Sequence, residues 1–518
     1  MSDYSYNLGL RFEVIASQYA ELDALVYPDG KSVTYGELDG FSNQLGRVLC
    51  QHGLTNGDIL LLSGDKSPTM FATILAALKC GFTYCIYDSE GPASRLKRII
   101  SVCHPKIIIS SPQDIESRQE DQESIAVLSY DELSKSAVSQ KSNPQMETAS
   151  VVGNQLAYIM FTSGSTGIPK GAMMTHTNVL TLIDWSLKTF NFRPGEILTN
   201  VNPSYFDNFV FDFYSALFTG ATLAPFTRDQ IVNPKVLVET IDLLGCTTWF
   251  SVPSMLLFLQ NMRALTPDNM SSIRRIIFGG EGYPKVKLVE LFEFYKNRIQ
   301  FFNVYGPTEC TCICSCYEVT ERDFDSLDGF LPLGSMIPNF GYHIMDERLR
   351  KVQLGERGEL CIWGPAVGRG YCNDRKRSEG AFVLDPTISN YNRVMYCTGD
   401  IVYQDTSDNK IYILGRYDNQ IKHMGHRIEL EEVENGLMEL PYISQACCVH
   451  GNINGLSKLI GVVEKKEEIT PLQIAEDLKS YLPKYMIPGQ FYILNSLPKN
   501  ANGKIDRMKL KSLYFELK

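Results

Sequence analysis

An eleven-residue segment rich in glycine and hydroxyl groups constrains this chain most. Phe161–Gly171 reads FTSGSTGIPKG and holds three glycines, four hydroxyl residues and one lysine. Neither a helix nor a strand favours this composition, because glycine loses much backbone entropy on ordering and hydroxyls compete for backbone hydrogen bonds. The apolar run Leu156–Met160 precedes it and is typical of a short buried strand. The sequence therefore predicts a strand followed by a loop, the order in which backbone N–H groups and a lysine cradle phosphates.

The spacing of this loop differs from that of the Walker motif. It runs Gly164-x-x-Gly167-x-x-Lys170-Gly171, and no Ser or Thr follows the lysine to hold Mg²⁺. The alternative interpretation is a flexible surface turn, so the rest of the chain must decide between the two.

Bulk composition excludes several classes of protein. At 518 residues the length predicts about three domains or subdomains. The balance of 49 basic and 59 acidic residues gives a net charge of −10, which provides no basic field for nucleic acid. The sequence contains no run of 18 apolar residues and no secretory leader, so we expect a cytoplasmic protein with no membrane partner. Its 14 cysteines fit reduced, mostly buried thiols.

Four of these cysteines alternate strictly in the segment ECTCICSCYE. The period of two predicts that Cys310, Cys312, Cys314 and Cys316 share one face of a strand. Four thiols spread along one strand cannot form a tetrahedron, so we expect core cysteines here rather than a metal site.

The pattern of apolar runs predicts an α/β protein. Helices are expected at 67–81, with Ser67 as N-cap, and at 285–295, whereas 59–62, 106–109, 247–252 and 275–278 are expected to be strands. The polar stretch 110–150 is expected to be a surface connection of low structural content, and 331–412 to be β-rich. We therefore predict a large N-terminal domain (1–417) of α/β subdomains plus a β-rich subdomain, followed by a small mobile α+β C-terminal domain (418–518).

Eight collinear motifs carry a family resemblance over almost the whole chain. Besides the glycine-rich loop they are SVTYGEL (32–38), LKCGFTYCIYD (78–88), NVYGPTE (303–309), GELCIWGPAVGRGY (358–371), YCTGD (396–400), GRYDNQIKHMGHRIELEEVE (415–434) and LPKNANGKIDR (497–507). With them the chain resembles the adenylate-forming superfamily, which contains nonribosomal peptide synthetase adenylation domains, carrier-protein ligases, acyl-CoA synthetases and luciferases.

The resemblance implies ATP and Mg²⁺ as cofactors. It implies that Glu309 coordinates Mg²⁺, that Lys170 holds the β- and γ-phosphates, and that Lys504 is the catalytic lysine that stabilises charge at the carboxylate and α-phosphate. Asp400 corresponds to the aspartate that accepts both ribose hydroxyls. The full set of implied ATP or AMP contacts is Thr162, Ser163, Gly164, Ser165, Thr166, Gly167, Lys170, Gly280, Glu281, Asn303, Tyr305, Gly306, Thr308, Asp400, Arg416 and Lys504.

The same resemblance implies a moving C-terminal domain. Asp418 corresponds to the hinge between two poses, one for each half-reaction, and Lys422 and Gly425 lie in the loop presented in the second pose. There the thiol of phosphopantetheine on a separate carrier protein would reach the adenylate, unless the chain is a piece of a larger synthetase.

One position separates amino-acid from acyl or aryl substrates. Asp207 stands where amino-acid-activating members hold the aspartate that pairs with the substrate ammonium, although a helix N-cap is an alternative role. The remaining substrate positions, mostly apolar, are Asn208, Phe211, Phe250, Ile277, Gly279, Val304, Cys312 and Ile313. They resemble pockets for isoleucine, valine or leucine, with Asn208 as a departure.

Three alternatives remain open at this point. FGGEGYP (278–284) and WFSVPS (249–254) also resemble D-alanine:carrier-protein ligases, although these have a bulkier residue where Gly279 stands, and a more open pocket argues against alanine. An acyl- or aryl-CoA ligase and a degenerate nucleotide-binding accessory subunit are the other two. The preferred hypothesis is a stand-alone enzyme that converts an aliphatic α-amino acid to aminoacyl-AMP and transfers it to a carrier protein.

Overall fold

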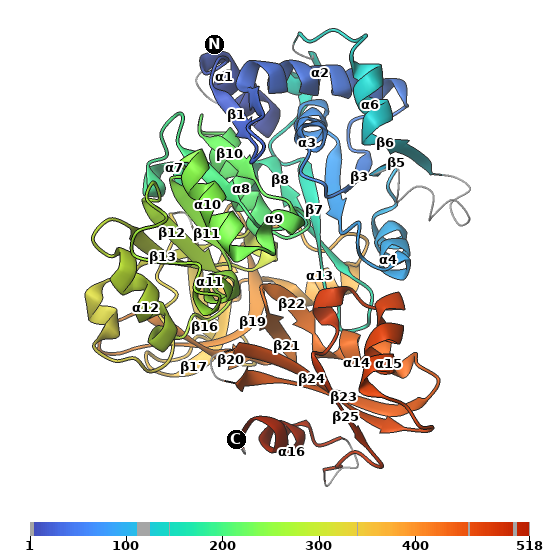
Figure 1. The fold of residues 1–518 in the computed structure, drawn as a ribbon, viewed down its shortest axis with the longest axis vertical. Helices are drawn as coiled ribbons and strands as arrows, with labels where there is room; N and C mark the ends of the chain where they lie inside the picture. The colour runs from blue at the N-terminus through green and yellow to red at the C-terminus, as the bar shows by residue number, and fades with distance from the viewer. Residues whose placement is uncertain are drawn as a thin grey trace. The chain divides into compact units, whose positions relative to one another are not determined.

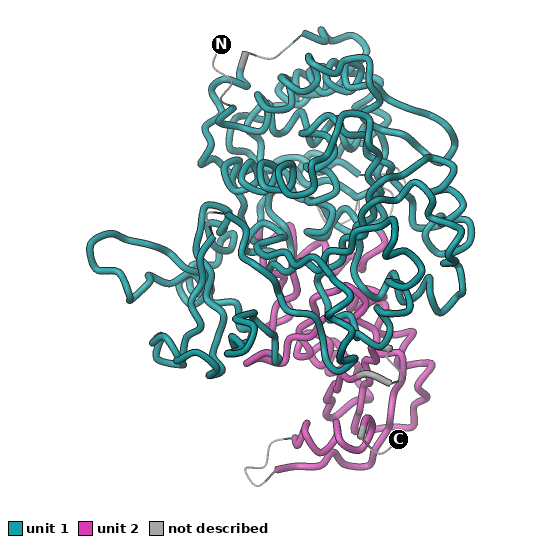
Figure 2. Tube along the Cα trace, turned by 90° about the vertical axis from the view of Figure 1, so that its left-hand side faces the viewer, with its two compact units in different colours: residues 1–89, 103–161, 171–415 teal, residues 90–102, 162–170, 416–518 magenta. Residues whose placement is uncertain are grey.

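The computed structural model describes residues 5–110, 125–143, 146–338, 340–453, 456–500 and 505–516. The chain divides into two compact units (Figure 2). Unit 1 comprises residues 1–89, 103–161 and 171–415, and unit 2 comprises residues 90–102, 162–170 and 416–518. The glycine-rich loop thus belongs, by its contacts, to the unit that contains the C-terminal hundred residues.

A six-stranded sheet in the N-terminal half leads into the loop. Its strands are apolar runs paired mainly in parallel (Figure 1), and the central strands β5, β3 and β4 are buried, whereas the edge strand β6 is largely exposed. In spatial order they are β6 (Ala126–Ser129), β5 (Ile107–Ser110), β3 (Ile59–Ser63), β4 (Thr83–Tyr87), β7 (Leu156–Thr162) and β8 (Lys170–Thr175). The loop joins β7 to β8, and the strand predicted before the loop is confirmed as β7.

A nine-stranded sheet carries most of the candidate substrate positions. Its six central strands are parallel, and the three outer ones pair antiparallel. The order is β15 (Ser335–Met336), β14 (Ser315–Glu318), β13 (Gln300–Tyr305), β12 (Arg275–Gly279), β11 (Thr248–Ser251), β9 (Ile197–Asn200), β10 (Thr222–Pro225), β1 (Asp23–Val26) and β2 (Ser32–Thr34). In sheets of this kind ligands bind beyond the carboxyl ends of the parallel strands.

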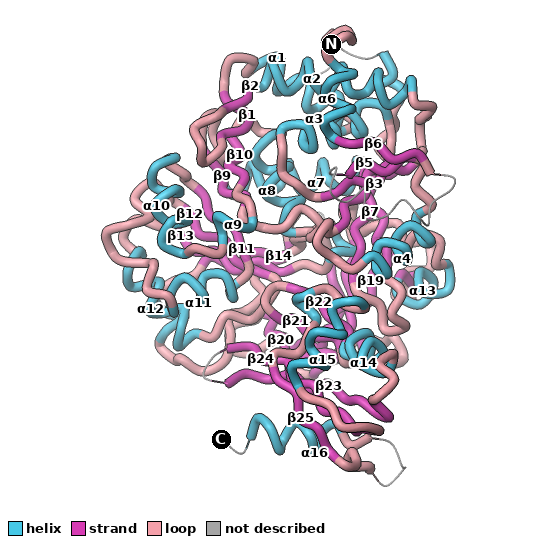
Figure 3. Tube along the Cα trace, turned by 45° about the vertical axis from the view of Figure 1, so that its right-hand side comes forward, coloured by secondary structure: helices cyan, strands magenta, loops and turns pink. Residues whose placement is uncertain are grey.

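Helices cover these sheets and fill the main core of unit 1. Helix α3 is buried from Met70 to Cys80 and packs against α1 and α2, as Figure 3 shows. The helices of this part are α1 (Leu8–Gln18), α2 (Tyr35–Gln51), α3 (Pro68–Cys80), α6 (Tyr130–Ala137), α7 (His176–Phe190), α8 (Asn208–Leu217), α9 (Arg228–Ile231), α10 (Pro234–Leu244), α11 (Pro253–Asn261) and α12 (Lys285–Tyr295). Helix α4 (Ala93–Cys103) belongs to unit 2 except for its last residue.

A third, five-stranded sheet completes unit 1. It consists of β16 (Gly341–Met345), β17 (Arg357–Trp363), β19 (Val394–Gln404), β18 (Phe382–Leu384) and β20 (Ile411–Arg416), with helix α13 (Arg375–Ala381) before β18. The β-rich character predicted for 331–412 is confirmed.

Unit 2 contains a hairpin, a three-stranded sheet and short helices. The hairpin is β21 (Gln420–His423) with β22 (His426–Glu429), and the sheet is β23 (Ile443–Ile453), β24 (Leu456–Lys465) and β25 (Gln490–Leu494). Its helices are α14 (Leu430–Met438), α15 (Pro471–Asp477) and α16 (Arg507–Lys511).

Most predicted elements are present, and two predictions are wrong. The α/β class is confirmed, and Ser67 caps α3 by accepting from the Met70 N–H. The alternating cysteines do not share a strand. Cys310 ends a 3₁₀ turn, Cys312 has a positive φ, and Cys316 lies in β14, because the backbone turns sharply after Glu309. The stretch 110–150 is also more structured than predicted, since β6 and α6 lie within it.

Candidate active site

Asp207 directly precedes α8, but its side chain does not cap the helix. Its backbone is right-handed helical (φ −65°, ψ −22°) instead of extended, and its side chain makes no capping hydrogen bond. Instead, its Oδ2 accepts a hydrogen bond of 2.6 Å from the Thr308 hydroxyl. A carboxylate from one segment is thus held by the motif NVYGPTE of another, about a hundred residues away in the sequence.

The predicted apolar substrate positions come together in one core cluster. This cluster is the main buried core of unit 1, in which α8 packs against β9, β10 and β11. Phe211 and Phe250 meet edge to face with ring centroids 4.8 Å apart. The cluster also contains Ile277, Val304, Cys312 and Ile313, all nearly fully buried. The N-terminus of α8 therefore places Asp207 and Asn208 next to an apolar wall.

Gly279 has a packing role that the sequence hides. A Cβ built on it would lie 2.3 Å from the Val304 carbonyl oxygen, so β12 and β13 approach too closely there for any side chain. The presence of glycine at position 279 therefore reflects the packing of the two strands and does not indicate a larger substrate pocket. The argument that an open pocket at Gly279 disfavours D-alanine loses its force.

Tyr305 and Asp400 form a buried pair. The Tyr305 hydroxyl, at the end of β13, donates to Asp400 Oδ2 at 2.5 Å. Burial and the neighbouring Asp400 raise the pKa of Tyr305, so the phenol remains a donor. The Asp400 N–H donates to Thr398 Oγ1 across Gly399, which lies at an irregularity in the pairing of β19 with β17. This pair joins the nine-stranded sheet to the five-stranded one.

Glu309 is fully buried, and one of its oxygens is fixed. Glu309 Oε1 accepts from the Tyr371 hydroxyl at 2.7 Å. Mg²⁺ in nucleotide enzymes is usually held by one or two carboxylates together with phosphate oxygens and water. A single oriented carboxylate therefore fits the magnesium role implied by the family motif.

Sequence reasoning missed Asp212, a buried carboxylate in the middle of α8. Its Oδ2 accepts from the side-chain amides of Asn200 at 3.0 Å and Asn202 at 2.9 Å. Asn202 also donates to the Phe250 carbonyl at 3.0 Å, so Asp212 braces the strand end that carries a wall residue. Burial raises the pKa of Asp212. Its position between apolar neighbours in FVFDFY gave no hint of the two asparagines.

The glycine-rich loop is held by carboxylates and backbone of unit 2. Lys170 Nζ lies 2.9 Å from Glu429 Oε1, and both side chains are mostly buried. The Gly164 N–H donates to Glu432 Oε2 at 3.2 Å, and the Ser163 hydroxyl donates to the Arg427 carbonyl at 2.7 Å. Within the loop, Thr162 Oγ1 is buried and accepts or donates no hydrogen bond among the described residues. An unsatisfied hydroxyl here is compatible with a phosphate oxygen as its partner.

A second layer of contacts supports this loop. Glu432 also pairs with Arg95 of α4 at 2.7 Å, yet burial outweighs this cation and raises the pKa of Glu432. Arg98 Nη1 donates to the Gly167 carbonyl at 2.9 Å. A cavity of about 490 Å³ lies beside the loop, lined in part by Arg98, Thr166, Glu432 and Tyr481. Ser165 and Thr166 are exposed.

Arg416 and the predicted hinge and thiolation residues lie in unit 2, in or just before the hairpin of β21 and β22. Arg416 and Asp418 form a two-pronged pair, with Nε–Oδ1 2.7 Å and Nη2–Oδ2 2.9 Å. Burial acts to raise the pKa of Asp418, but the bonds from Arg416 hold it below its ordinary value. Lys422 lies in β21, and Gly425, with φ +82°, forms the tight turn of the hairpin with Met424. Lys504 lies outside the described residues.

Four predicted nucleotide contacts lie at the carboxyl ends of β12 and β13. Glu281 Oε2 accepts from the Ser254 N–H at 3.2 Å, and the Asn303 amide donates to the Pro332 carbonyl at 2.9 Å. Gly280 has a φ of +88°. A Cβ on Gly306 would lie 2.1 Å from the Cys312 carbonyl oxygen, so only glycine fits there.

Comparison with known proteins identifies the family. The model of the AMP-binding enzyme family matches residues 12–372, and that of the AMP-binding enzyme C-terminal domain matches residues 432–504. The chain belongs to the AMP-binding enzyme family, and it is an ATP-using ligase of the adenylate-forming superfamily.

Curated relatives match nearly the full chain. A D-alanine–D-alanyl carrier protein ligase of Bacillus licheniformis is 33% identical over 93% of this chain and 94% of the relative. An L-proline–[L-prolyl-carrier protein] ligase of Pseudomonas fluorescens is 30% identical over 94% of this chain and 95% of the relative. In fold, the chain is similar to an artificially fused adenylation–PCP di-domain protein from Klebsiella oxytoca, with a TM-score of 0.81 at 23% identity, covering 96% of this chain and 95% of that one.

No helix within the described residues is both long and apolar enough to cross a membrane.

Proposed function

We propose that this enzyme activates an α-amino acid as its aminoacyl adenylate and transfers the aminoacyl group to the phosphopantetheine thiol of a carrier protein. The observation that carries the proposal is the position of Asp207, a carboxylate fixed by Thr308 at the edge of an apolar cluster. A carboxylate there would pair with the ammonium group of an amino acid whose side chain faces Phe211 and Phe250.

In the first half-reaction a substrate carboxylate oxygen attacks the α-phosphorus of ATP, and the bond to pyrophosphate breaks. Asp400 would accept from the ribose hydroxyls while Tyr305 keeps that carboxylate oriented. Glu309 would hold Mg²⁺, which supplies charge compensation to the phosphates when it is bound. Lys170 and the N–H groups of the loop would bind the departing pyrophosphate, and Lys504 would stabilise charge at the reacting groups.

The acidic partners of the loop imply an exchange during turnover. Glu429 occupies the Lys170 ammonium, and Glu432 occupies the Gly164 N–H, which are donors that phosphates would use. A polyphosphate would compete with these two carboxylates, because the Gly164 N–H has one hydrogen to donate and Glu429 already neutralises the Lys170 ammonium. We therefore assign these contacts within unit 2 to a state without pyrophosphate.

The side chain of the amino acid is proposed to be aliphatic. The apolar cluster supports an isoleucine-, valine- or leucine-like substrate. D-Alanine is the second candidate, because a D-alanine–D-alanyl carrier protein ligase is 33% identical to this chain and Gly279 no longer argues against it. Single methylenes are distinguished by only about 1–3 kcal/mol, so several aliphatic amino acids should be accepted.

ATP–pyrophosphate exchange with twenty amino acids, D-alanine and a set of aliphatic and aryl carboxylic acids tests the proposal. Exchange with aliphatic amino acids, or with D-alanine, supports it; exchange with carboxylic acids alone would identify an acyl- or aryl-CoA ligase, and no exchange a nucleotide-binding accessory subunit. Lys504→Ala should nearly abolish adenylate formation and spare thioester formation from supplied aminoacyl adenylate. Equal loss of both half-reactions would contradict the role of Lys504.

A further inference from the structure

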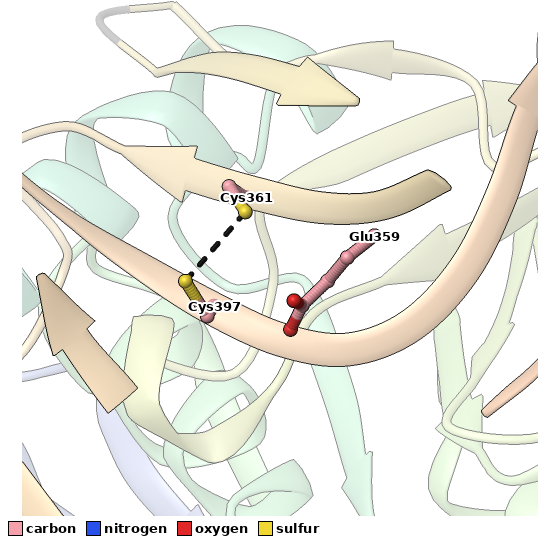
Figure 4. Close-up of side chains that lie close together, drawn as sticks. All are labelled: Glu359, Cys361 and Cys397. Carbon is pink, nitrogen blue, oxygen red and sulfur yellow. Dashed lines mark hydrogen bonds between the residues drawn. The ribbon is translucent and has the colours of Figure 1, made fainter. Parts of the chain in front are cut away.

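Two cysteines face each other across neighbouring strands of the five-stranded sheet. Cys361 of β17 and Cys397 of β19 are paired directly in the strand register, and their sulfur atoms are 3.6 Å apart. Figure 4 shows the two thiols pointing toward one another, with the Glu359 carboxylate beside them. The ligand atoms of these three residues all lie within 4.8 Å of one another.

We propose that Glu359, Cys361 and Cys397 form a binding site for a thiophilic divalent cation of the Zn²⁺ type. Zinc binds cysteine sulfur at about 2.3 Å, so two thiolates on one tetrahedral ion are about 3.8 Å apart. The two sulfur atoms are 3.6 Å apart without a cation, which is close to this sulfur–sulfur distance in a tetrahedral zinc site. The carboxylate would be the third ligand, and water the fourth.

The surroundings of the three groups favour a metal ligand set. The Gly399 N–H donates to Glu359 Oε1 at 2.7 Å, and such an outer contact orients a ligating carboxylate. Cys361 is buried in a small cluster with Met345 and Met395, so the thiols lie against soft sulfur-containing side chains. Cys397 and Glu359 are half-buried, which leaves an approach from solvent.

Binding is coupled to proton release in a defined way. Each thiol exchanges its S–H proton for an S–Zn bond, so one Zn²⁺ releases two protons and no electrons are transferred. The affinity should therefore increase with pH.

The site differs from the alternating cysteines considered from the sequence. Glu359 and Cys361 are two residues apart on β17, and Cys397 comes from β19, so two strands contribute ligands to one point. Asp400 follows Cys397 by three residues on β19, so a cation would tie together the two strands beside the Asp400–Tyr305 pair.

The test is zinc titration of the full, metal-free chain kept reduced with a phosphine. Competition with a chromophoric chelator measures affinity, and a pH indicator in weak buffer measures proton release. We expect one tightly bound Zn²⁺ and two protons released. Cys397→Ser, at the half-buried position, should abolish this binding, and Glu359→Gln, which keeps an acceptor for the Gly399 N–H, should weaken it.

A second contacting thiol pair provides the matched control. Cys50 is exposed, and its hydrogen bond to Cys80 lowers the pKa of Cys50 to about 7, so it is the more accessible thiol for an adventitious ion. Cys50→Ser should leave the tight binding unchanged. The proposal is overturned if no zinc binds, if Cys397→Ser binds as the parent does, if Cys50→Ser removes the binding, or if Glu359→Gln has no effect.

Discussion

The proposed site residues of the two units have different hydrogen-bond partners. In unit 1, the three carboxylates assigned to substrate, magnesium and ribose each accept from a neutral hydroxyl: Asp207 from Thr308, Glu309 from Tyr371 and Asp400 from Tyr305. In unit 2, the loop donors contact carboxylates, with Lys170 paired to Glu429 and Gly164 bonded to Glu432.

The three carboxylates of unit 1 with their hydroxyl partners form a preorganised arrangement, which we call the preformed frame. The loop of unit 2 would instead exchange partners when it binds a phosphate. A hydroxyl orients a carboxylate without cancelling its charge, so the groups of unit 1 stay suited to an ammonium, a cation and ribose hydroxyls. An ion pair, in contrast, already satisfies Lys170. Under the proposed function, a phosphate at the loop would compete with these carboxylates, which would lower its net affinity and favour its release.

The largest expected effect concerns the charge of Asp207. Asp207→Asn keeps an acceptor for Thr308 but removes the partner of the substrate ammonium. We expect kcat/KM for the preferred amino acid in ATP–pyrophosphate exchange to fall about 150-fold, or about 3 kcal/mol, with the KM for MgATP unchanged.

The control for this substitution lies in the same helix. Asp212 has a raised pKa and accepts from two amides, so Asp212→Asn replaces it with a neutral group of the same shape and should change kcat/KM only a few-fold. If Asp207→Asn showed the same few-fold loss, Asp207 would not recognise the substrate ammonium. The contrast between the carboxylates of unit 1 and the loop of unit 2 would then lose its main support.

The next substitution tests whether Gly279 is required for the packing of β12 against β13 or for the size of the substrate pocket. Gly279→Ala places a methyl group against the Val304 carbonyl and should destabilise unit 1 by about 2 to 3 kcal/mol, without changing the ranking of amino acids. Gly380→Ala, where a Cβ meets no atom within 4 Å, is the neutral control. Thermal unfolding and a panel of exchange rates distinguish the outcomes: normal stability with a preference shifted to smaller amino acids would make Gly279 a pocket residue.

A smaller effect concerns the acid limit of unit 1. His176 is buried at the start of α7, its Nδ1 accepts from the Leu8 N–H at 3.1 Å, and burial lowers its pKa to about 3. Because the folded pKa lies below the unfolded value of about 6.5, this contribution is present above pH 6.5 and is lost as the pH falls toward 3. At pH 5 the expected loss is about 2 kcal/mol.

Tryptophan fluorescence measures this loss in unit 1, where Trp185, Trp249 and Trp363 all lie. His176→Asn, which keeps an acceptor near Nδ1 but does not titrate, should show a flatter dependence of unfolding on pH between 7 and 5. A parallel dependence in both proteins would assign the acid sensitivity to other groups.

The sequence predicts elements well where local chemistry determines them. Ser67, Pro68 and Gly81 mark the ends of α3 with an N-cap, a first-turn proline and a left-handed C-cap, and the structure has all three. It fails where the determinant is distant. The strand predicted for Cys310–Cys316 is broken by positive φ values at Thr311 and Cys312, which the period of two does not reveal.

The same limit applies to the site. The family motifs predict Asp207, Glu309 and Asp400 as site residues, but each carboxylate has its hydrogen-bond partner in another segment, and these pairs with Thr308, Tyr371 and Tyr305 are visible only in the fold. Gly279 resembled an open position because sequence records the missing side chain and not the neighbouring strand that excludes it. The carboxylate partners of the loop were equally hidden, since Glu429 is 259 positions from Lys170.

The smallest expected effect is the most direct test of exchange at the loop. Glu429→Gln removes the charge that pairs with Lys170, so a phosphate no longer competes with a carboxylate for this ammonium. We expect pyrophosphate to bind about 5-fold more tightly, or about 1 kcal/mol, and to be released more slowly after adenylate formation. Glu431→Gln, whose side chain contacts Asn419 instead, is the charge-matched control. Weaker pyrophosphate binding in Glu429→Gln alone would mean that Glu429 supports the phosphate site. The loop would then be preorganised, as the carboxylates of unit 1 are, and would not exchange partners.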